Sequence, residues 1–83
     1  ALASQMKRAA LSVASNIAEG HSRHHRAEYR QGVSIAIGSL AELETPLHVA
    51  RELRLLDAQS ASSVFSRIDR LRAMLITLGK KLA

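Results

Sequence analysis

Apolar residues recur along the chain at alternating spacings of three and four, in three successive stretches. Residues at these spacings lie on one face of an α-helix, while the polar residues between them lie on the other. The apolar positions of the first stretch are Leu2, Met6, Ala9, Val13 and Ile17. Leu11 lies nearly opposite this face; a lone exposed leucine usually has no structural role, but on so small a bundle it is also a candidate for a second packing face. The pattern predicts a helix that ends near Gly20, where a glycine can adopt the left-handed conformation of a C-cap.

The second stretch forms a heptad seam, for which Ser22 is a candidate N-cap. Pro46 falls inside the seam and predicts a kink and not an end, because the apolar register continues beyond it. Gly32 and Gly38 each lower helix propensity by about 1 kcal/mol relative to alanine, so we expect them to allow close helix approach. The apolar positions are Tyr29, Val33, Ala36, Leu40, Leu43, Leu47 and Ala50.

The third stretch predicts another amphipathic helix, with Asp57 or Ser60 as its N-cap and Phe65 widening its apolar face. We expect breaks near residues 20–22 and 56–57. Three such helices with short connections fold back on one another, so the sequence predicts an all-α, antiparallel up-down helical bundle in a single domain, residues 1–83. The apolar positions of the third stretch are Ala61, Val64, Ile68, Leu71, Leu75, Leu78 and Leu82.

The small size and the lack of cysteine limit how this chain can be stabilised. A core of 83 residues is marginal without disulfides, metal or association, so we expect partner helices. The absence of cysteine excludes disulfides, thiolate metal sites and cysteine nucleophiles, and it suits a reducing cytoplasm. The apolar runs are far shorter than the roughly 20 residues that span a bilayer. We therefore expect a soluble cytoplasmic protein.

The chain is basic, with 12 Lys and Arg against 7 Asp and Glu and a formal net charge of +5. This charge favours a polyanionic partner such as RNA or DNA. Small bacterial proteins are also basic for solubility alone, and the basic residues can equally lie on solvent-exposed faces or form subunit contacts. Tyr29 and Phe65 are the only aromatic residues, so nucleic-acid binding would use phosphates and not base stacking. The candidate phosphate-binding residues are Lys7, Arg8, Arg23, Arg26, Arg30, Arg51 and Arg54.

Three histidines and one glutamate form the only local cluster that resembles a metal site. His21, His24, His25 and Glu28 are spaced so that some share a helix face. The cluster lies at a polar helix start and has no evident second shell, so the sequence favours solvated histidines over a metal site. Protonation of these histidines would strengthen the positive charge of the neighbouring arginines.

No arrangement of residues predicts catalysis. Glu42 and Glu44 cannot form a same-face carboxylate pair, because residues two apart on a helix diverge by about 200°. The serines have no base partner nearby, and no glycine-rich phosphate loop or nucleophile elbow occurs. We therefore expect a protein that is not an enzyme and needs no cofactor.

Two segments carry a family resemblance. The run from Gln5 to Gly20, which contains Asn16-Ile-Ala-Glu19-Gly20, resembles the signature of the four-helix-bundle family named for proteins encoded within 23S rRNA intervening sequences. Arg23, Glu28-Tyr29 and the run from Ile35 to Thr45 match the family's second motif in order. Pro46 departs from the family, which commonly has a good helix former there. The polar signature residues are Asn16, Glu19, Ser39 and Glu42, which we interpret as a structural network joining the first helix to its neighbours or to Arg23.

The resemblance implies that this chain corresponds to helices two to four of a four-helix bundle, with a further helix before Ala1. It also implies a homo-oligomer, since members and the related accessory protein of diversity-generating retroelements form ring-like pentamers. Those retroelement relatives are basic and associate with nucleic acid and a reverse transcriptase, so the resemblance implies contact with RNA or DNA and a protein partner. The alternative is a structural or protein-interaction scaffold with no nucleic-acid role.

Overall fold

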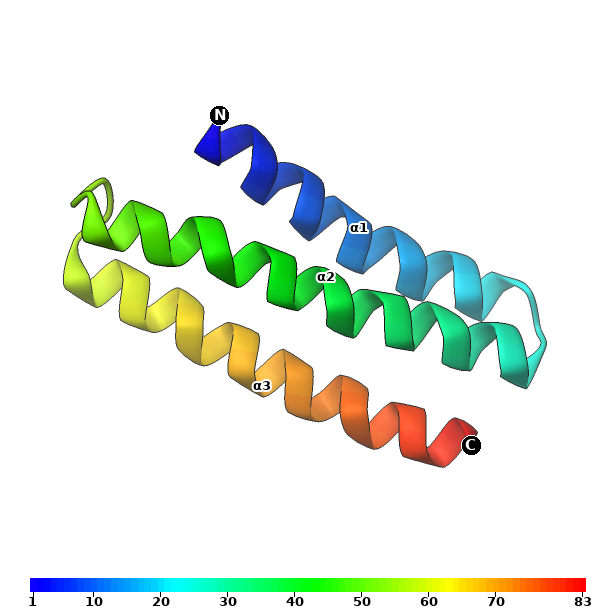
Figure 1. Cartoon of the computed structure of the whole chain (residues 1–83). Coiled ribbons are helices and arrows are strands. Elements are labelled where there is room, and N and C mark those ends of the chain that lie inside the picture. Colours follow the sequence, from blue (N-terminus) through cyan, green and yellow to red (C-terminus); the bar gives the residue numbers. More distant parts are fainter.

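The computed structural model describes residues 1–83 and contains three α-helices and no β-strand (Figure 1). The helices are α1 (Leu2–Ser22), α2 (Arg26–Glu52) and α3 (Ala58–Leu82). The prediction of an all-helical chain is confirmed. None of the three helices combines the length and the apolar character needed to cross a membrane.

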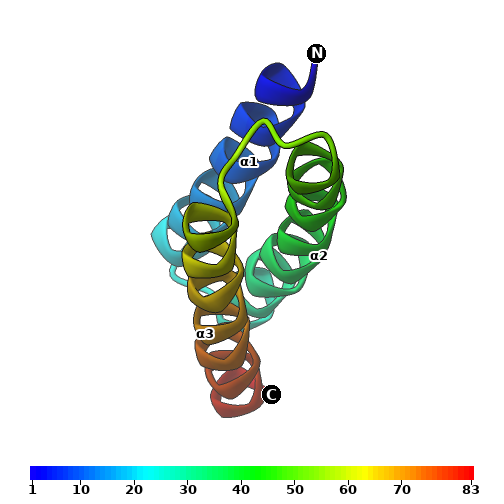
Figure 2. The ribbon, with the colours of Figure 1, turned by 90° about the vertical axis from the view of Figure 1, so that its left-hand side faces the viewer.

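The helix α2 is central, and the chain reverses direction at each of the two loops (Figure 1). Both α1 and α3 pack against α2, but they do not pack against each other. The molecule is therefore a thin layer with extents of 43 × 23 × 13 Å. Figure 2 shows the loop between α2 and α3 crossing from one helix to the other, with α1 behind them.

The core follows the predicted apolar faces. Only 14 of the 83 residues are buried, which is a small core for a chain of this length. Leu40 and Leu47 of α2 are among the largest fully buried side chains, and Leu11 is 67% exposed, as its position off the apolar face predicts. All ten buried apolar residues lie on the three predicted faces: Ala9, Val13, Val33, Ala36, Leu40, Leu47, Ala50, Ala61, Ile68 and Leu75.

The turn between α1 and α2 differs from the prediction in two ways. Gly20 does not end α1, because the helix continues to Ser22 and the left-handed residue is His24, with φ of 60°. Ser22 does not cap α2, because its hydroxyl donates to the Glu19 carbonyl at 2.9 Å. His25 precedes α2 instead and provides no side-chain cap. The turn thus lies a few residues later than the glycine suggested.

The start of α3 is capped as predicted by Asp57. Its carboxylate accepts a hydrogen bond from the Ser60 backbone N–H at 2.7 Å and another from the Ser60 hydroxyl at 2.8 Å. These hydrogen bonds stabilise the ionised carboxylate and lower the pKa of Asp57 below its ordinary value. Asp57 therefore serves as an N-cap in its ionised form.

The helix α2 continues without interruption through the buried Pro46 to Glu52. The prediction that the proline does not end the helix is therefore confirmed. Pro46 borders a cleft that is also lined by Ala9 and Ser12 of α1.

Candidate nucleic-acid interface

Two glycines bring the end of α1 and the start of α2 into close contact. A Cβ atom on Gly32 would lie 2.5 Å from the carbonyl oxygen of Asn16, and a Cβ atom on Gly20 would lie 3.2 Å from the carbonyl oxygen of Glu28. The backbones therefore approach at a distance that no larger residue permits at position 32. The prediction for Gly38 is wrong, because no atom lies within 4 Å of a Cβ built there.

One side-chain hydrogen bond crosses the same interface, and Asn16 of α1 bonds to one of its two serines. The hydroxyls of Ser12 on α1 and Ser39 on α2 lie 2.8 Å apart, and Ser39 is only 5% exposed. The Asn16 amide donates to the Ser12 carbonyl at 2.8 Å and to the Ser12 hydroxyl at 3.2 Å. Ser39 therefore satisfies a polar group across the α1–α2 contact, whereas both hydrogen bonds of Asn16 stay within α1.

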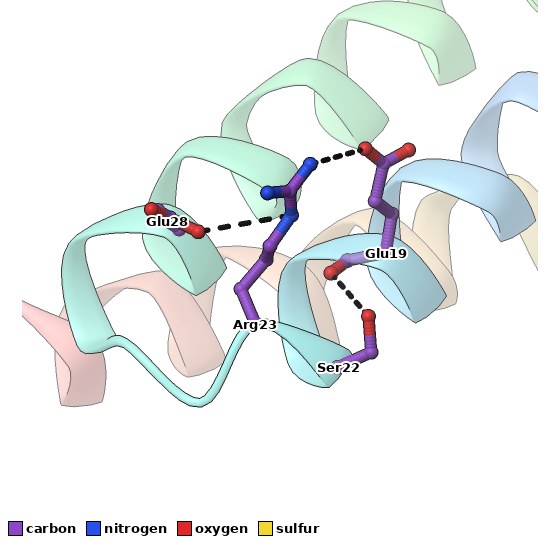
Figure 3. Close-up of polar contacts among 4 residues, drawn as sticks. All are labelled: Glu19, Ser22, Arg23 and Glu28. Carbon is purple, nitrogen blue, oxygen red and sulfur yellow. Dashed lines mark hydrogen bonds and ion pairs between the residues drawn. The ribbon is translucent and has the colours of Figure 1, made fainter.

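Arg23 joins the end of α1 to the start of α2 (Figure 3). Its guanidinium lies 3.3 Å from the Glu19 carboxylate and 3.8 Å from that of Glu28. All three side chains are well exposed, so each pair contributes at most about 1 kcal/mol. Together with Asn16 and Gln31 they border an open polar cleft of about 350 Å³ above the two glycines.

Arg26 and Arg30, at the start of α2, contact the end of α3. The Arg26 guanidinium donates to the carbonyl of Lys81 at 2.9 Å, and that of Arg30 donates to the carbonyl of Leu82 at 3.5 Å. These arginines therefore satisfy carbonyl groups that the end of α3 leaves free. Because the start of α2 contacts the end of α3, Lys80 and Lys81 lie at the same end of the molecule as Arg26 and Arg30. The sequence alone did not predict this grouping.

The three clustered histidines lie at this end too, and all are exposed. The His21 ring meets the Tyr29 ring edge-on, with 5.3 Å between centroids. His24 occupies the turn, and His25 directly precedes α2. No three His, Cys, Asp or Glu side chains are placed so that they could hold a metal ion together.

The other predicted phosphate-binding residues lie toward the opposite end. Lys7 and Arg8 lie in the first half of α1, and Arg54 lies in the loop after α2 with φ of 58°. The Arg51 guanidinium stacks over the Phe65 ring, 4.9 Å from its centroid, and lies 3.0 Å from Nδ1 of His48. The seven candidates therefore form two groups at opposite ends and not one continuous surface.

Most of the basic side chains have no carboxylate partner within the chain. Arg23 and Arg72 make all four ion pairs, the latter with Asp69 at 3.1 Å and with Glu44 across the α2–α3 contact. The other ten of the twelve basic side chains pair with no carboxylate, and all ten residues are exposed. The signature residue Glu42 is also exposed and makes no ion pair.

The fold and this surface define a small, basic, all-helical protein organised around one central helix. A family model described as 23S rRNA-intervening sequence protein matches residues 1–77, and the chain belongs to that family. Comparison with curated proteins finds no match.

Proposed function

We propose that this protein is a non-enzymatic homo-oligomer that contacts the phosphates of RNA or DNA through its basic surface. The observation that carries the proposal is that ten of twelve basic side chains are exposed and lack a carboxylate partner. Such charge binds phosphates and releases their condensed counterions, which favours association at low salt. With two aromatic residues in the chain, recognition depends on the backbone and tolerates many sequences.

The proposed assembly is a four-helix bundle that forms ring-like pentamers in the cytoplasm, as the family resemblance implies. The small core supports this proposal, since α1 and α3 do not pack on each other. Several apolar residues that pack against the core remain half-buried, so a further helix or subunit can cover them. They include Met6, Ile17, Leu43, Leu71 and Leu78.

The test is the salt dependence of binding to a generic duplex RNA and a generic duplex DNA, with the oligomeric mass measured on the same sample. We expect a homogeneous oligomer whose affinity falls steeply with salt, because each phosphate contact contributes about 0.9 to the slope of log K against log salt. Failure to retain either nucleic acid at low salt would remove the proposal.

The second candidate function is a scaffold for another protein. It is supported by large apolar side chains that are more than 60% exposed, at Leu11, Leu53, Leu55 and Met74. Under this alternative the arginines interleave with glutamates at subunit interfaces, whereas a nucleic-acid-binding protein gathers them on an open surface. A structure of the oligomer would distinguish the two functions by showing whether the arginines lie at subunit interfaces or on an open surface.

A further inference from the structure

We infer that the end of the molecule where α1 ends, α2 begins and α3 ends is the principal phosphate-binding site, and that histidine protonation regulates its affinity. We call this surface the basic end. The inference rests on the proposed function and names its site and its regulation. The basic end comprises Arg23, Arg26, Arg30, Lys80 and Lys81 together with His21, His24 and His25.

The basic end is assembled from segments that lie far apart in the sequence. The hydrogen bonds from Arg26 to the Lys81 carbonyl and from Arg30 to the Leu82 carbonyl join residues more than 50 positions apart. Each guanidinium has five N–H donors. Because these bonds use only one terminal nitrogen of each arginine, the remaining donors face solvent and are available to phosphate oxygens.

The charge at the basic end is only partly neutralised. Its five basic side chains face two side-chain carboxylates, Glu19 and Glu28, which leaves a local side-chain charge of +3 when the histidines are neutral. Both carboxylates contact Arg23. Four cations therefore remain without a counter-charge, which is the arrangement that attracts a phosphodiester backbone.

The three histidines convert this charge into a pH-dependent quantity. Histidine is the side-chain type that can gain a positive charge near physiological pH, and protonation of all three would raise the local side-chain charge from +3 to +6. The ring of His21 meets the ring of Tyr29 of α2 edge-on. Charged groups from all three helices surround the histidines. The carboxylates are Glu19 of α1 and Glu28 of α2. The cations are Arg23 at the end of α1, Arg26 and Arg30 of α2, and Lys80 and Lys81 of α3. The cations outnumber the carboxylates and oppose a further positive charge on the histidines. A bound phosphate supplies negative charge next to them and so favours their protonated form.

The fourth histidine supplies an internal control. His48 lies near the end of α2, where its ring stacks on Phe65 at 4.4 Å between centroids. It is therefore absent from the basic end, although it is exposed like the other three histidines. A general effect of histidine protonation on net charge would include His48, whereas a local effect would not.

The experiment measures the affinity of the full chain for a duplex RNA by fluorescence anisotropy at pH 8.0 and pH 5.5, across a range of salt concentrations. We expect at least tenfold tighter binding at pH 5.5. We also expect a steeper salt slope, by about 0.9 for each histidine that contacts a phosphate. The oligomeric mass is measured at both pH values.

Two histidine variants test the regulation. The triple substitution His21→Gln, His24→Asn and His25→Gln should retain the affinity at pH 8.0 and lose most of the gain at pH 5.5. Asparagine is chosen at position 24 because it tolerates the left-handed conformation there. His48→Gln should keep the full gain. Equal pH dependence in the triple variant and the parent chain would overturn the inference, as would a loss of the gain in His48→Gln.

Two charge variants test the location. Lys80→Gln with Lys81→Gln should weaken binding at least fivefold at both pH values, because two of the cations at the basic end are removed. The fold should be unaffected, since the hydrogen bonds to the end of α3 use backbone carbonyls and not these side chains. Arg67→Gln with Arg70→Gln removes the same charge from elsewhere on α3 and should have a smaller effect. Equal losses would place the site elsewhere. Binding that is unaffected by pH would overturn the regulation alone, whereas no binding at either pH would overturn the proposed function itself.

Discussion

The contact between α1 and α2 and the contact between α2 and α3 differ in the size of the side chains that form them. Between α1 and α2 the helices meet through Gly20, Gly32 and the paired serines 12 and 39, so that backbone approaches backbone. The core cluster, which joins Val13 of α1 to both other helices, contains larger side chains such as Leu40 of α2 and Ile68 of α3, and the Glu44–Arg72 pair lies across the α2–α3 contact. The same central helix is therefore held in two ways, by close backbone contact and by large apolar side chains, and each is disrupted by a different kind of substitution.

The largest expected effect comes from removing a bulky side chain from the core cluster. Leu40 is 2% exposed and belongs to the core cluster, so Leu40→Ala should leave a cavity and lower the free energy of unfolding by about 4 kcal/mol. Urea denaturation followed by circular dichroism measures the change. Leu11→Ala is the control, because this exposed leucine should change stability by less than about 0.5 kcal/mol. Similar losses in both variants would contradict the assigned core.

The second effect comes from adding one carbon atom at the α1–α2 contact. Gly32→Ala places a Cβ atom against the Asn16 carbonyl, an overlap that should cost about 3 kcal/mol and be offset by about 1 kcal/mol of helix propensity. We therefore expect a net loss of about 2 kcal/mol in thermal or urea denaturation. Gly38→Ala, with nothing near its Cβ, should instead gain about 1 kcal/mol. A gain in both variants would show that α1 does not approach α2 so closely.

A smaller effect is expected from the polar part of the same contact. Ser39→Ala removes the hydrogen bond to Ser12 from a nearly buried position and should lower the free energy of unfolding by about 1 kcal/mol. Ser34→Ala, at an exposed position of the same helix, should be neutral or slightly stabilising. If the two variants proved equally stable, the serine pair would contribute nothing to the contact.

The smallest effect is expected at the start of α3, the only helix with a side-chain N-cap. The pKa of Asp57 is lower in the folded chain than its ordinary value. Its contribution to stability is therefore present above about pH 4 and is lost as the pH falls through the lowered pKa. Asp57→Ala should melt at a lower temperature than the parent chain at pH 7. The difference should shrink in acid, and a constant difference would contradict an ionised cap.

The helix faces could be predicted because burial follows helical periodicity. Val13, Leu47 and Leu75 are each buried where the spacing of three and four places them. The roles of the glycines could not be predicted in the same way. Gly32 and Gly38 look alike in the sequence, but only the position of α1 decides that one touches a backbone and the other faces open space.

The candidate site could be predicted only in its parts. Arg26 and Arg30 were identified by charge, but their contacts with the end of α3 depend on how α3 packs against α2. Gly20 has the local features of a C-cap, yet its close contact with α2 explains the glycine better, and His24 adopts the left-handed conformation instead. Local patterns cannot distinguish such alternatives, because each depends on a partner helix.

The absence of packing between α1 and α3 has a consequence for how the chain folds. Each helix contacts only its neighbour in the sequence, and the connecting loops span just residues 23–25 and 53–57. The entropy lost in closing such loops is small, and topologies dominated by local contacts fold in microseconds to milliseconds. The central helix alone is covered on two sides, so its amide protons should exchange with solvent most slowly. The two outer helices can then open one at a time while α2 stays protected by the other.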